Sequence, residues 1–145
     1  MDETMDTVER ITRRRARVAT AMGVLFVATQ LAHLHGQAPL RAVDYVGIAG
    51  WAVWALVLVA FVLFGGGLLR GPAVRGMLND ESTEANRRTA LVAGFWAMLT
   101  AAATLFVSSF YEELGGRDTL HILITVGVGF ALIRFGQLEA RALKE

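Results

Sequence analysis

Long apolar segments separated by charged residues divide the chain into four hydrophobic stretches. We place them at about 18–35, 45–69, 89–111 and 119–138. The second and third contain no charged residue, and the fourth reaches its full length if the Arg134 side chain extends toward the lipid headgroups. A hydrocarbon layer of about 30 Å needs about 20 helical residues, so we expect all four stretches to span a membrane. Two spans with two surface helices is the weaker alternative, because the first and fourth stretches lack a wide charged face.

The connections between these stretches predict how the helices are arranged. The outer connections are short, and short connections make successive helices antiparallel neighbours. The predicted fold class is therefore all-α: one transmembrane domain of residues 1–145, built as an up-down four-helix bundle. We expect its contact faces along small residues at four-residue spacing, namely Ala28, Ala32 and Gly36, then Ala93, Ala97 and Ala101, and finally Thr125 and Gly129.

Composition supports a membrane protein and excludes several kinds of chemistry. The 145 residues are 54% hydrophobic and 19% charged, which is more apolar and less charged than a typical soluble domain. The chain has no cysteine, which excludes disulfides, thiolate metal sites and covalently attached haem. A net charge of +1 argues against nucleic acid as a partner.

The positions of the basic residues predict orientation. Of the 14 basic residues, all but Arg41 and Arg117 lie before the first stretch, between the second and third, or in the C-terminal part from Arg134 onward. By the positive-inside rule, the N-terminal segment 1–17, the loop 70–88 and the C-terminus are cytoplasmic. Within this loop, Asp80 is expected to cap a helix that leads into the third stretch. The expected location is a bacterial inner (plasma) membrane with several passes.

The two ends of the chain carry further expectations. Acid-to-base spacing of four residues predicts a short amphipathic helix on the inner surface within 1–17. A cleaved signal peptide is disfavoured, because the nearest small-residue site, Gly36-Gln37-Ala38, is followed by Pro39. The residues from Phe135 to the C-terminus are expected to form a water-exposed extension of the fourth helix.

Few residues suggest chemistry. No ionisable residue is deep in a predicted span, so we assign no catalytic residue and expect no enzymatic activity and no cofactor. Three histidines nevertheless fall at the outer ends of the first and fourth helices. One alternative is a metal ion held by His33, His35, His121, Glu112 and Glu113.

A second alternative uses the same region. His33 and His121 would ligate a b-type haem from both sides. The histidines are more simply explained by structural contacts, with His33 hydrogen-bonding between helices beside Gln30, and Asp118 capping the fourth helix.

A resemblance directs attention to the middle loop. The segment Asn79-Asp80-Glu81-Ser82-Thr83, continued by Asn86-Arg87-Arg88, resembles the segment before a membrane helix in small uncharacterised bacterial four-helix inner-membrane proteins of the domain-of-unknown-function type. The resemblance implies no catalytic residue. It suggests a surface for a cytoplasmic partner made by Asp80, Glu81, Glu84, Arg87 and Arg88.

The predicted function is that of a non-enzymatic accessory or regulatory subunit in the lipid bilayer, which contacts a membrane or cytoplasmic protein through its helix faces or the middle loop. Homo-oligomer formation is a further expectation about partners. The competing functions are a metal- or haem-binding membrane protein that uses the outer histidines, and a small transporter or pore.

Overall fold

The protein is all-helical in the part of the chain that its structure describes. The computed structural model describes residues 2–31, 42–64, 81–113 and 115–143, and in these ranges it contains no strand. The helices are α1 (Asp2–Leu31), α2 (Ala42–Leu63), α4 (Glu81–Ser108) and α5 (Gly116–Ala142). The predicted all-α class is therefore confirmed.

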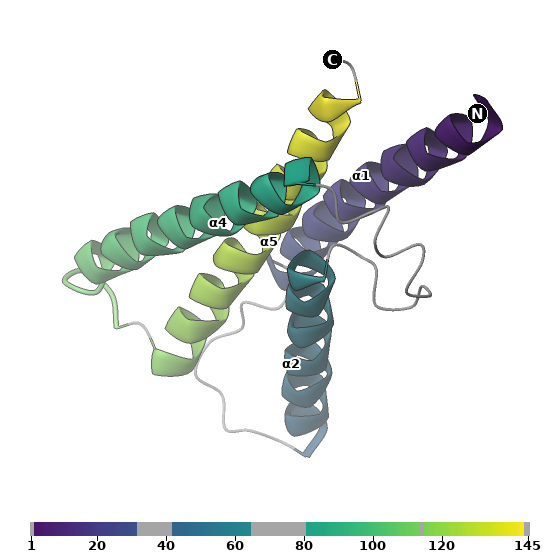
Figure 1. Cartoon of the computed structure of the whole chain (residues 1–145). Helices are drawn as coiled ribbons and strands as arrows, with labels where there is room; N and C mark the ends of the chain where they lie inside the picture. Colours follow the sequence, from purple (N-terminus) through teal and green to yellow (C-terminus); the bar gives the residue numbers. More distant parts are fainter. Residues whose placement is uncertain (1, 32–41, 65–80, 114, 144–145) are drawn as a thin grey trace.

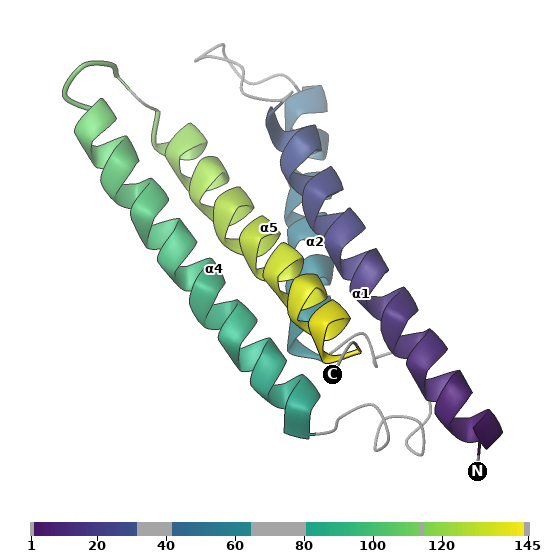
Figure 2. The same ribbon diagram turned by 90° about the horizontal axis from the view of Figure 1, so that it is seen from above.

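The centre of the fold is α5. Figures 1 and 2 show α5 between α1 and α4, and both of these helices pack extensively against it. The contacts of α2 with α5 and α4 are fewer. In Figure 2, α1 and α4 run in the direction opposite to α5, so the start of α5 lies near the ends of α1 and α4.

Residues without large side chains allow the close approach of α1 and α4 to α5. A methyl group added to Gly136 would touch the Thr20 hydroxyl and lie 2.7 Å from the carbonyl oxygen of Ala16 on α1. On the other side of α5, a methyl group on Gly94 of α4 would lie 2.7 Å from the carbonyl oxygen of Gly127. Small residues at such positions allow the helix backbones to approach closely, as is typical of helices that pack within lipid.

The contact face of α1 differs from the predicted one. Ala16, Ala19 and Gly23 are buried, whereas Ala28 is exposed, so the prediction for Ala28 is wrong. The other two positions of that predicted stripe, 32 and 36, lie outside the described residues. On α5, the predicted contact residues Thr125 and Gly129 are buried, as expected. On α4, the three predicted alanines, Ala93, Ala97 and Ala101, are partly buried.

Two apolar clusters fill the interior. The larger joins Phe26 of α1 to Ala55, Leu58 and Val62 of α2 and to Leu132 of α5. The smaller joins one buried residue from each of three helices: Ala19 of α1, Ala90 of α4 and Phe135 of α5. The first cluster therefore attaches α2 to the α1–α5 pair, and the second attaches α4.

Large apolar side chains also cover much of the outer surface. Val46 and Leu56 of α2 are 72% and 68% exposed, and Phe106 of α4 is 65% exposed. Three helical segments among the described residues are long and apolar enough to cross a membrane: Asp44–Leu63, Ser82–Ser108 and Gly116–Ala142. They correspond to the second, third and fourth predicted spans. The first, 18–35, lies partly in α1 and partly outside the described residues.

Several helix boundaries differ from the predicted ones. The N-terminal residues do not form a separate short helix, because α1 continues from Asp2 through the first hydrophobic stretch to Leu31. Within the predicted loop 70–88, by contrast, the helix expected after Asp80 is confirmed, since α4 begins at Glu81 and continues into the third hydrophobic stretch. The N-cap residue of α5 is Gly115, without a side-chain capping bond, so the predicted capping role of Asp118 is wrong.

Candidate functional site

A buried ion pair lies beside the middle of α1, where α4 begins and α5 ends. The Arg15 guanidinium of α1 pairs with the Glu139 carboxylate of α5, and these residues are only 6% and 1% exposed. Charged groups are rarely buried so completely unless they are paired, because each loses its hydration. The pair therefore joins the first half of α1 to the last turns of α5.

Two polar residues of α4 complete this network. The Nη2 of Arg15 donates to the Thr83 hydroxyl oxygen at 3.1 Å, and the Nδ2 of Asn86 donates to Glu139 Oε1 at 3.2 Å. Thr83 and Asn86 are three residues apart and so lie on one face of α4. The network thus connects three helices, and each carboxylate oxygen of Glu139 accepts a hydrogen bond.

The network rests directly on the smaller apolar cluster. Phe135 lies one turn before Glu139 on the same face of α5, and the Arg15 guanidinium carbon is 5.7 Å from the centre of its ring. This distance permits a cation–π attraction. Phe135 therefore shields the ion pair on one side.

This network was not predicted. The sequence interpretation placed the residues from Phe135 onward in a water-exposed extension, which is wrong for Phe135, Gly136 and Glu139 because all three are buried. The partners of Glu139 come from α1 and α4, and local spacing does not identify them.

A second polar contact lies at the opposite end of the fold, where α1 ends and α5 begins. The Nε2 atom of His121 is 2.7 Å from Oε1 of Gln30, so the imidazole donates to this amide oxygen. The Trp51 ring of α2 stacks on His121, with ring centres 4.6 Å apart and planes 15° from parallel. His121 therefore joins three helices.

The residues of the proposed metal and haem sites are only partly described. His33 and His35 lie outside the described residues. Glu112 and Glu113 are exposed in the turn after α4. Among the residues that the structure describes, no group of three His, Cys, Asp or Glu side chains is placed to hold a metal ion.

The residues of the predicted partner surface lie at the start of α4. Asp80 is outside the described residues, and Glu81 is the first residue of the helix. Glu84 and Arg88 are exposed. Arg87 instead makes a structural contact: its Nη1 donates to the carbonyl oxygen of Leu63 at 2.8 Å, which joins the start of α4 to the end of α2. Its Nη2 lies 3.6 Å from Glu84 Oε1.

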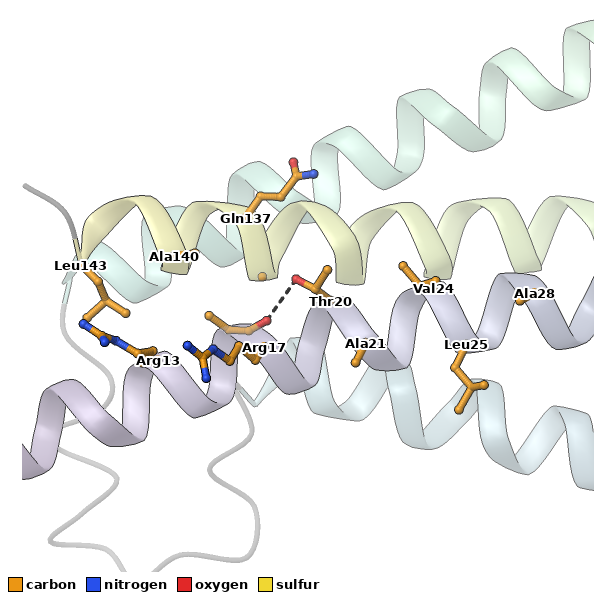
Figure 3. A pocket seen from close by; sticks show the side chains of 12 residues that line it. Arg13, Arg17, Thr20, Ala21, Val24, Leu25, Ala28, Gln137, Ala140 and Leu143 are labelled. Atoms are coloured by element: carbon orange, nitrogen blue, oxygen red, sulfur yellow. Dashed lines mark hydrogen bonds between the residues drawn. The ribbon is translucent and has the colours of Figure 1, made fainter.

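An open groove of about 1060 Å³ runs between α1 and α5. Figure 3 shows Arg13 and Arg17 toward one end, with Val24, Leu25 and Ala28 toward the other. The Thr20 hydroxyl donates to the carbonyl oxygen of its own helix at Ala16, at 3.1 Å. The groove is consequently apolar along most of its length and cationic at one end.

Comparisons with protein-family models, with curated proteins and with solved structures found no significant match to this chain. The class that the described residues define is an all-helical protein with three helices long and apolar enough to cross a membrane.

Proposed function

We propose that the chain is a multi-pass integral membrane protein in which α1 forms a fourth span. The observation that supports this is the outward-facing apolar surface of α2 and α4, including Val46, Leu56 and Phe106. Exposing such side chains to water costs about 25 cal/mol per Å² of apolar surface, whereas lipid tails accept them without that cost. The four helices then form an up-down bundle in a bacterial inner membrane.

The orientation follows from the arginines. Both termini and the connection between α2 and α4 lie on the cytoplasmic side, because nearly all basic residues flank the helices there. The buried ion pair of Arg15 and Glu139 is then near the cytoplasmic interface, and the contact of His121 with Gln30 is near the outer one.

The absence of native cysteine makes this topology directly testable. Arg88→Cys and Glu112→Cys each place a single thiol at an exposed position at opposite ends of α4. A membrane-impermeant maleimide should label the thiol at position 112 in spheroplasts, and the thiol at position 88 only after the membrane is permeabilised. The opposite pattern would refute the orientation, and release of the protein by alkaline carbonate would refute the membrane location.

The proposed activity is that of a non-enzymatic accessory subunit that contacts a cytoplasmic protein through the start of α4. This proposal is supported by the way in which Arg87 fixes the start of α4 and leaves neighbouring charged side chains exposed. Arg87 joins the first turns of α4 to the end of α2 through the Leu63 carbonyl, while the side chains of Glu84 and Arg88 are exposed. Exposed residues of opposite charge are suited to selecting a partner by charge complementarity.

Purification from native membranes in mild detergent tests this activity. The double variant Glu84→Arg/Arg88→Glu reverses both charges and should abolish stoichiometric recovery of the partner. A matched control, Glu112→Arg/Arg117→Glu, makes the same exchange at the other end of α4 and in the first turn of α5, and should retain the partner. A partner recovered equally with both variants would exclude this surface.

A further inference from the structure

The groove between α1 and α5 combines features that point to one class of ligand. Arg13 and Arg17 lie one helical turn apart on one face of α1, and the same face continues through Ala21, Val24 and Ala28. Two cationic side chains are thus followed by an apolar part of the groove along one face of α1. This order matches an anionic headgroup followed by an acyl chain.

Small residues form part of the groove lining. They include Ala16 of α1 and Gly136 and Ala140 of α5, which have a methyl group or no side chain. The Thr20 hydroxyl also lines the groove, and it donates its hydrogen bond to its own helix. The volume of about 1060 Å³ slightly exceeds the range typical of small-molecule sites, about 300–1,000 Å³, so the groove has room for a larger ligand such as a lipid.

The arginine side chains at the charged end of the groove can bind an anion. Arg13 forms an exposed ion pair with Glu9 at 2.7 Å. Arg17 is exposed, and no ion pair joins it to another of the described residues. A phosphate group beside Arg17 would therefore gain a charge-assisted contact without displacing an existing one.

We propose that this groove binds one anionic phospholipid, with its phosphate at Arg17 and Arg13 and an acyl chain along Ala21, Val24 and Ala28. The inference rests on the proposed membrane location. In the proposed orientation, the two arginines lie at the cytoplasmic leaflet, where anionic lipids attract basic side chains. The lipid fills a groove that the packing of α1 on α5 leaves open.

Native mass spectrometry of the full chain in dodecylmaltoside tests the proposal, with dioleoyl phosphatidylglycerol as the ligand and dioleoyl phosphatidylcholine as the zwitterionic control. The wild type should retain one phosphatidylglycerol per chain and bind it more tightly than phosphatidylcholine. Arg17→Gln should weaken phosphatidylglycerol binding about fivefold, the effect of losing one arginine near an anionic lipid. Equal retention of the two lipids by the wild type would overturn the proposal.

Matched variants separate a built site from general attraction to positive charge. Arg14→Gln removes the same charge from an exposed arginine that does not line the groove, and binding should stay within about twofold of wild type. Ala21→Phe fills the apolar part of the groove without changing charge and should reduce binding, whereas Val18→Phe, outside the groove, should not. Equal losses from Arg14→Gln and Arg17→Gln would overturn the proposal.

Two further outcomes show whether a second copy of the chain occupies the groove and whether the lipid site or the membrane location is wrong. A dimer in the same spectra that Ala21→Phe abolishes would show that a second copy occupies the groove, and would overturn the lipid assignment. Carbonate extraction tests the membrane location separately from the lipid site. Protein that stays in the membrane but shows no lipid preference refutes the lipid site alone, whereas extracted protein refutes the proposed membrane location.

Discussion

Removing one member of the Arg15–Glu139 pair is expected to destabilise the protein much more than removing both. Glu139→Leu leaves the Arg15 guanidinium buried without its carboxylate, and it also removes the acceptor of the Asn86 amide. Breaking a buried ion pair in this way costs about 3–5 kcal/mol of unfolding free energy. Arg15→Met should have a similar cost, since it removes the charged partner of the buried Glu139 carboxylate and leaves the hydrogen bond from Asn86.

The double variant Arg15→Met/Glu139→Leu removes both buried charges. Apolar replacement of a buried pair is often close to neutral, so we expect its stability within about 1 kcal/mol of wild type. Thr83 and Asn86 then lose their charged partners, which keeps the variant from becoming strongly stabilised. The two single effects therefore should not add.

Reversible unfolding in mixed micelles of dodecylmaltoside and dodecyl sulfate, followed by far-ultraviolet circular dichroism, measures these free energies. Arg14→Met is the matched control, because its side chain is exposed beside Arg15, and its effect should remain within about 0.5 kcal/mol. If the double variant lost the sum of the two single losses, the pair would not be energetically coupled. The assigned network would then be refuted.

Two further variants test the packing and the second polar contact. Gly136→Ala should cost about 1–3 kcal/mol, because the added methyl group meets backbone atoms of α1 at 2.7 and 2.9 Å. Gly50→Ala, with nothing within 4 Å, should be neutral or stabilising by up to about 1 kcal/mol, and equal effects in the same unfolding assay would contradict this packing. His121→Leu removes the contact with Gln30 and the stacking on Trp51, which should cost about 1–2 kcal/mol and shift the tryptophan emission. An unchanged emission spectrum and stability would contradict the assigned contacts of His121.

The helices themselves could be predicted because their apolar runs are long and uncharged. The segments 45–69, 89–111 and 119–138 overlap α2, α4 and α5, since in these runs a helix is the structure that satisfies backbone hydrogen bonds in an apolar environment. The boundaries were less predictable. Polar residues can extend a helix beyond its apolar part without changing the hydropathy pattern, and at the start of α4 it was the capping residue type of Asp80 that indicated the extension.

The continuity of α1 could have been predicted more closely. The change from arginine-rich to apolar sequence near residue 17 suggested a boundary between a surface helix and a span. No proline or glycine occurs in α1 before Gly23, however, so nothing in the local sequence interrupts the backbone hydrogen bonds. Hydropathy changes along α1, whereas its helical conformation does not.

The burial of Glu139 could not be predicted from its own surroundings in the sequence. It lies in a polar C-terminal segment, and its exposure depends on Arg15 and Asn86, which are far away in the chain. The same holds for His121, whose partners come from α1 and α2. Local patterns identify which face of a helix is apolar, but they do not identify the polar side chains that meet between helices.

The ion pair also explains how α1 and α5 select one alignment. Their other contacts join small residues that repeat at intervals of three or four, such as Ala16, Ala19 and Gly23, so a shift by one turn would preserve much of the apolar packing. A shift would separate Arg15 from Glu139, and this cost distinguishes the observed alignment from its neighbours. The double variant Arg15→Met/Glu139→Leu should therefore remain folded while α1 occupies more than one alignment along α5. Cysteine pairs introduced across α1 and α5 would cross-link in a single alignment in the otherwise wild-type chain and in several in the double variant, and a single alignment in both would refute this role.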